Sequence, residues 1–107
     1  VIRFLGVFEP YRIAYREKQE DKEQKRAEAV AACYLMVKEG KRMPEEEEWF
    51  RPFWVLAFDG AIDESNEEIA QSCIAAYEDA FGVQDRYLKK MRKKLEDLIK
   101  EKAGAAG

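Results

Sequence analysis

Five basic residues lie close together near the carboxyl end of the chain, in the run Lys89-Lys90-Met91-Arg92-Lys93-Lys94. On an amphipathic helix, such a run is typical of a surface for nucleic acid, an anionic membrane or a calmodulin-like partner. The apolar anchors of a helix that docks into a groove would be Leu88, Met91, Leu95 and Leu98. The alternative is a solvated face on a helix that packs into the core.

This basic surface would consist of Lys89, Lys90, Lys93 and Lys94. Nucleic acid is the least favoured of its partners, because the formal net charge of the chain is −3. Tyr87 is also the only aromatic residue beside the run, whereas proteins that bind single strands stack bases on several aromatic rings.

Histidine and cysteine, on which many nucleophilic and zinc sites depend, are scarce, and the 22 acidic residues are too many for their proximity to indicate a site. The chain has no His and two cysteines, Cys33 and Cys73. The lack of His removes Ser–His and Cys–His pairs and zinc sites with imidazole ligands, and two cysteines cannot complete a four-cysteine site. Both cysteines fall in apolar stretches, which favours buried, reduced thiols over a disulfide or a reactive cysteine. We therefore predict no enzymatic activity, no metal and no cofactor.

The segment Asp59-Gly60-Ala61-Ile62-Asp63 resembles the middle of a calcium-binding loop. With Gly60 at the invariant glycine of such a loop, Val55 and Ala57 occupy positions that need acids, and Asn66 replaces the bidentate Glu. Calcium binding is therefore not expected, and Asp59-Gly60 is interpreted as a turn.

The composition predicts that helices position all of these residues. The chain of 107 residues has no Thr and is 38% charged, and Ala, Glu, Lys, Arg and Leu are plentiful. We predict an all-α fold, an irregular three- to four-helix bundle with a long first helix and a C-terminal helical hairpin. The predicted helices span residues 11–39, 44–58, 64–81 and 85–103.

Local signals mark the ends of these helices. The predicted starts are Pro44 with the acids Glu45–Glu48, the capping box Ser65–Glu68, and Asp85. The predicted stops are Gly40 and Gly82. Because Pro52 lacks an amide hydrogen, it should kink or restart the second helix.

The first predicted helix has two unlike halves. Residues 16–26 contain no apolar side chain, and their ion pairs at i,i+4 nearly cancel, so this stretch is supported by its ends or by a partner, or it frays. Residues 27–37 are apolar on every side except at Glu28. That pattern predicts a central helix buried on all sides.

Two apolar segments are candidates for contacts with another protein. Residues 1–10 form an apolar N-terminal arm, ahead of a helical domain at 11–103 and a disordered tail at 104–107. Five large aromatic residues fall within 49–58. The predicted partner-binding residues are Phe4, Phe8, Trp49, Phe50 and Trp54. The alternative is that both segments complete the core of the domain.

These features together predict a non-catalytic structural or accessory subunit whose partners are other protein subunits in a larger assembly. The alternative function is a regulated binding module that uses the basic helix at 85–102. No apolar run is long enough for a membrane span. The cysteines favour a reducing intracellular compartment, and the start at Val1 leaves open an organelle entered with loss of a targeting segment.

Overall fold

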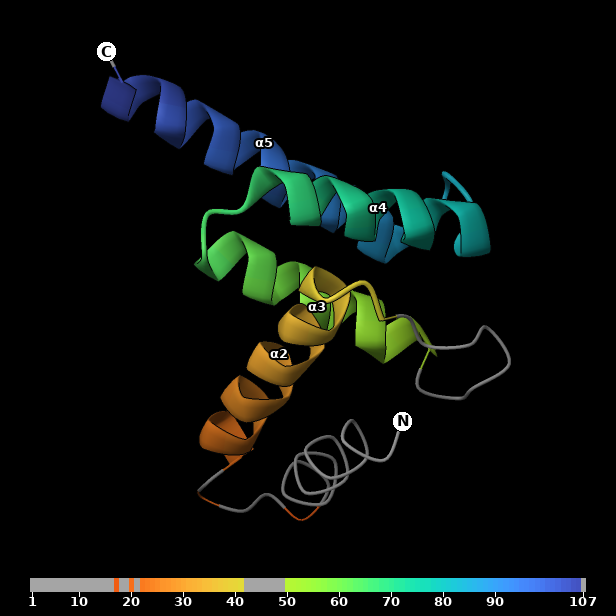
Figure 1. Ribbon diagram of the computed structural model, residues 1–107. Coiled ribbons are helices and arrows are strands. Elements are labelled where there is room, and N and C mark those ends of the chain that lie inside the picture. Colours follow the sequence, from red (N-terminus) through yellow and green to blue (C-terminus); the bar gives the residue numbers. More distant parts are fainter. Residues whose placement is uncertain (1–16, 18–19, 21, 42–49, 107) are drawn as a thin grey trace.

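The described part of the chain, in a computed structural model, folds into helices and contains no strand (Figure 1). It comprises residues 22–41 and 50–106 with Glu17 and Glu20. The helices are α2 (Lys22–Lys38), α3 (Phe50–Asp63), α4 (Glu67–Phe81) and α5 (Arg86–Ala106). The predicted all-α helical bundle is confirmed. None of these helices combines the length and the apolar composition that crossing a bilayer requires.

Helix α2 ends at the predicted glycine. Gly40 has a φ of 82°, in the left-handed region that glycine adopts without steric cost. Its N–H donates to the carbonyl of Val37 at 2.9 Å, and the N–H of Lys41 donates to the carbonyl of Met36 at 2.8 Å. These two bonds form a Schellman motif, which satisfies carbonyls that the end of the helix leaves free.

Helix α3 continues through the segment that was expected to be a turn. Asp59 and Gly60 are both helical, and the helix ends at Asp63. The prediction of a turn at Asp59-Gly60 is therefore wrong. Pro52 falls in the first turn of α3, where its missing amide hydrogen costs no hydrogen bond.

A non-glycine residue ends α3. Ser65 has a φ of 55°. Its N–H donates to the carbonyl of Ile62 at 3.0 Å, and the N–H of Asn66 donates to the carbonyl of Ala61 at 2.8 Å. Asn66 also caps α4, since its Oδ1 accepts from the N–H of Ile69 at 3.1 Å. The predicted capping box placed this role on Ser65, one residue too early.

The hairpin of α4 and α5 is confirmed, and the two helices pack against each other. Gly82 ends α4, and Asp85 caps α5 by accepting from the N–H groups of Tyr87 at 2.8 Å and Leu88 at 3.3 Å. Helix α5 then runs to Ala106, so the predicted disordered tail is wrong for residues 104–106.

The central helix is α3, which contacts α2, α4 and α5 (Figure 1). Phe53, Ala57, Phe58 and Ala61 of α3 are fully buried. The prediction that residues 27–37 are buried on every side is wrong, because α2 buries one side only.

A small residue allows α2 and α3 to pack closely: a Cβ on Gly60 of α3 would lie 2.6 Å from the Cβ of Tyr34.

Candidate protein-binding surface

The aromatic residues of α3 that were predicted to meet a partner belong to the core instead. Phe50 is 9% exposed and Trp54 is 3% exposed. Their rings meet edge to face at 6.2 Å, and the ring of Phe50 lies 5.7 Å from that of Phe81 on α4. Phe50 and Trp54 are therefore covered by the chain itself, and a partner-binding role for them stays a prediction. The other predicted residues, Phe4, Phe8 and Trp49, lie outside the described part of the chain, as does the arm at 1–10.

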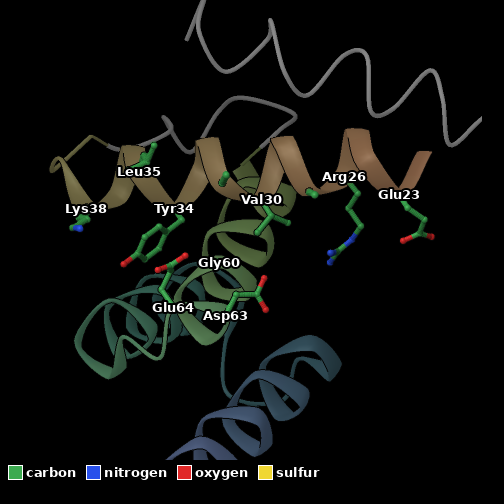
Figure 2. A pocket seen from close by; sticks show the side chains of 11 residues that line it. Glu23, Arg26, Val30, Tyr34, Leu35, Lys38, Gly60, Asp63 and Glu64 are labelled. Carbon is green, nitrogen blue, oxygen red and sulfur yellow. The ribbon is translucent and has the colours of Figure 1, made fainter. Parts of the chain in front are cut away.

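The outward side of α2 carries an exposed apolar row that was not predicted. Ala27, Ala31 and Leu35 are spaced one turn apart, and all three are exposed. Leu35 is 49% exposed although the other side of the same helix is core. Figure 2 shows Leu35 directed away from α3. The sequence could not distinguish the exposed row of α2 from the buried side of the same helix, because residues 27–37 are apolar on both sides.

A groove of about 490 Å³ runs beside this row, between α2 and α3. Its apolar lining includes Val30, Tyr34 and Gly60 (Figure 2). The three residues of the exposed row also line the groove. The remaining lining residues are charged and comprise Glu23, Arg26, Lys38, Asp63 and Glu64. The row and the groove together are called the α2 surface below.

The α2 surface is held in place by polar contacts to the rest of the bundle. Asp59 of α3 pairs with Arg26 of α2 and, at 3.2 Å, with the Nζ of Lys94 of α5. At the other end of the groove, the Nδ2 of Asn66 donates to the hydroxyl oxygen of Tyr34 at 3.1 Å. These contacts fix the position of α2 across α3.

The predicted basic surface on α5 is divided by the fold. All four lysines are exposed, but Lys94 pairs with Asp59 of α3, whereas Lys93 pairs only within α5. The apolar residues that would anchor α5 in a partner's groove are used internally: Leu88, Met91 and Leu98 are buried, and Leu95 is partly buried. Binding through these anchors in a calmodulin-like mode would therefore require α5 to separate from the hairpin, and this function stays a prediction.

The two cysteines are free thiols, both fully buried. Burial, and secondarily the nearby Cys73, raises the pKa of Cys33 to about 12. Cys33 is therefore protonated at neutral pH, and a thiol is a poor nucleophile. Within the described residues, no cluster of three His, Cys, Asp or Glu side chains is placed to hold a metal.

A buried tyrosine fixes the turn between α4 and α5. The hydroxyl of Tyr77 donates to the Oδ1 of Asp85 at 2.8 Å, and Arg51 of α3 lies 3.5 Å from the Oδ2 of Asp85. Desolvation acts to raise the pKa of Asp85, but the hydrogen bonds from Tyr77 and from two backbone N–H groups, with the charge of Arg51, outweigh it and lower that pKa. Desolvation and the same hydrogen bond raise the pKa of Tyr77 to about 12.

These pKa shifts come from groups that cap a helix or fill the core, and neither Asp85 nor Tyr77 lines the groove beside α2.

The chain matches no protein-family model, no curated protein and no solved structure, so its role must be inferred from the surfaces described above.

Proposed function

We propose that this chain is a non-catalytic accessory subunit that binds another protein through the α2 surface. The observation that carries the proposal is the exposed row of Ala27, Ala31 and Leu35 on a helix that is anchored to the core by its other side. A large apolar side chain held half in water gains free energy when a partner covers it.

The shape of the α2 surface favours a helical partner. The row from Ala27 to Leu35 is about 12 Å long, which corresponds to roughly two turns of a facing helix. The two alanines are small enough for the backbone of another helix to approach closely. Charged side chains at both ends of the groove, including Glu23 and Lys38, suit a partner helix that is apolar along one stripe and polar beside it.

Burial of the exposed row alone would contribute too little free energy for a stable complex. Full burial of a leucine side chain contributes about 1.5–3 kcal/mol, and Leu35 starts half buried. A stable complex therefore needs contacts beyond the row, because Val30 and Tyr34, which line the groove beside it, are only 6% and 8% exposed.

The chemistry of the described residues supports a role without catalysis. Cys33 is protonated at neutral pH. Two of the carboxylates with little exposure, Asp59 and Asp85, are held in ion pairs with Arg26 and Arg51. These groups stabilise the bundle and are not positioned as an acid–base pair in the groove.

Site-specific photo-cross-linking in cells tests the proposal. A photoreactive amino acid replaces Leu35 in one variant and Gln71, on the exposed side of α4, in the control. We expect a discrete cross-linked protein from position 35 and none from position 71. Equal cross-linking at both positions, or none at position 35, would contradict the proposal.

A matched pair of substitutions then tests the contact itself. Ala31→Arg places a long charged side chain on the α2 surface, and Ala75→Arg makes the same change on an exposed position of α4. The first substitution should abolish cross-linking from position 35, and the second should leave it unchanged.

A further inference from the structure

The basic residues of α5 divide into two sets with different surroundings. Those at the sides of the helix pair with other helices: Arg92 with Glu78, Lys94 with Asp59, and Lys102 with Glu67 at 3.5 Å. Of the others, Lys100 lies farther along the helix, and Arg86, Lys89, Lys90 and Lys93 are spaced i, i+3, i+4 and i+7 and all exposed. These four residues are called the outer basic face below.

The core packing of α5 fixes the direction of the outer basic face. Leu88, Met91 and Leu98 are buried on the opposite side of the helix. Helix α5 contacts both α3 and α4, so the four bases point away from the bundle. In Figure 1, α3 lies between α2 and α5, which separates the outer basic face from the α2 surface.

The outer basic face is poor in intramolecular partners. Among the described residues, no acidic group lies within ion-pair distance of Arg86, Lys89 or Lys90. Lys93 reaches only Asp97, one turn along its own helix at 3.8 Å. The Nζ of Lys90 lies 5.7 Å from the ring centre of Tyr87. Nearly all of this positive charge is therefore available to an external anion.

Two of the most exposed large apolar side chains adjoin these bases. Val83, in the turn before α5, is 50% exposed, and Tyr87, in the first turn of α5, is 48% exposed. Tyrosine is enriched at membrane–water interfaces, where its ring meets the acyl region and its hydroxyl remains hydrated. Bases beside such residues attract anionic headgroups.

We propose that the outer basic face, with Val83 and Tyr87, binds the surface of a bilayer that contains anionic phospholipid. A straight helix on the outside of the bundle can lie along a flat surface, so that all four bases approach headgroup phosphates together. Two of the acids of α4, Glu78 and Glu67, already pair with Arg92 and Lys102 of α5, and the axes of two packed helices lie about 8–10 Å apart. This distance is about one Debye length at physiological salt, so their repulsion is weakened by screening.

The same features disfavour nucleic acid as the partner. Among the residues that the structure describes, Tyr87 is the only exposed aromatic ring beside the bases, whereas single-stranded partners need several stacking platforms. A duplex takes most of its affinity from many phosphate contacts, and α4 beside α5 adds none, because residues 63–81 contain six acids and no base.

Vesicle sedimentation with the full chain tests the inference. The probes are vesicles of phosphatidylcholine with phosphatidylserine, vesicles of phosphatidylcholine alone, and a short DNA duplex. The test variant carries Lys89→Gln, Lys90→Gln and Lys93→Gln. The control carries Lys25→Gln, Lys38→Gln and Lys41→Gln, which changes the net charge equally in and just after α2. Circular dichroism confirms that both variants fold.

We expect the wild type and the control to bind the phosphatidylserine vesicles alone. Binding should fall when salt rises from about 0.1 M to about 1 M, because the Debye length shortens from about 10 Å to about 3 Å. The test variant should bind about fivefold more weakly per lysine, on the order of 100-fold in all. Absence of wild-type binding, equal losses in test and control variants, or binding to the duplex in place of the vesicles would overturn the inference.

Discussion

Gly60 and Tyr34 lie in direct contact where α3 crosses α2. A Cβ added at Gly60 would meet the Cβ of Tyr34 at 2.6 Å and the carbonyl oxygen of Val30 at 3.2 Å. The carbonyl oxygen of Val30 belongs to the backbone of α2, and the Cβ of Tyr34 is bonded directly to that backbone. Neither atom can therefore move away by rotation of a side chain. The missing side chain of Gly60 therefore sets how closely α2, which carries the proposed binding surface, approaches the central helix.

Gly60→Ala is expected to destabilise the protein despite the better helix propensity of alanine. Propensity alone would add about 1 kcal/mol, but the overlap with Tyr34 requires α2 to shift, which typically costs about 1–3 kcal/mol. Gly104→Ala is the matched control, because nothing lies within 4 Å of its added Cβ. Urea denaturation should show the free energy of unfolding lowered by the first substitution and unchanged or raised by the second. A rise for Gly60→Ala would show that the helices do not pack this closely.

Ser65→Gly is expected to stabilise the protein by about 0.5–1 kcal/mol, since the φ of 55° at Ser65 costs less for glycine. Ser72→Gly makes the same chemical change in the middle of α4 and should lower the free energy of unfolding by a few tenths of a kcal/mol. Thermal unfolding followed by circular dichroism measures both. Equal shifts in the same direction would rule out left-handed strain at Ser65.

The acid sensitivity of the fold is expected to depend on Asp85. Its pKa is lowered in the folded state, so its contribution to stability is complete above the ordinary pKa of about 4 and is lost as the pH falls through the lower, folded value. Asp85→Asn keeps a capping side chain but removes the charge. The difference in free energy of unfolding between wild type and variant should be constant at neutral pH and shrink below about pH 4. A difference that is constant at all pH values would contradict this role.

Both thiols are expected to be inert in the folded protein. Cys33 and Cys73 are fully buried, and burial raises the pKa of Cys33 to about 12. A chromogenic disulfide reagent at neutral pH should therefore label neither thiol until urea unfolds the chain. In Leu35→Cys, the new thiol on the exposed row should react at once. Rapid labelling of the wild type would show that the core opens or that the thiols are accessible.

Local patterns in the sequence predicted the helical bundle and several helix ends. Gly40, Gly82 and Asp85 act as expected, because a helix end depends on the conformation and hydrogen bonds of residues close in sequence. The prediction of a turn at Asp59-Gly60 was wrong because a tertiary contact, and not a turn, explains the glycine at position 60. Gly60 is required by its contact with Tyr34, which is 26 positions away in the sequence and leaves no local signal.

The candidate surfaces were harder to predict for the same reason. An apolar run such as 27–37 does not reveal which of its sides meets α3, so Leu35 could not be distinguished from Tyr34. Similarly, the run of bases in α5 did not reveal that Lys94 pairs with Asp59 while Lys89 faces outward. The relative rotation of packed helices decides both cases, and it depends on side chains distant in sequence.

Hydroxyl-radical footprinting of the chain, alone and in the complex isolated from cells, tests the proposed α2 surface most directly. Leu35 should be modified in the isolated chain and protected in the complex, whereas Val83, which is equally exposed, serves as the internal reference. The proposal predicts protection at Leu35 with little change at Val83. Equal modification of Leu35 in the isolated chain and in the complex would contradict it.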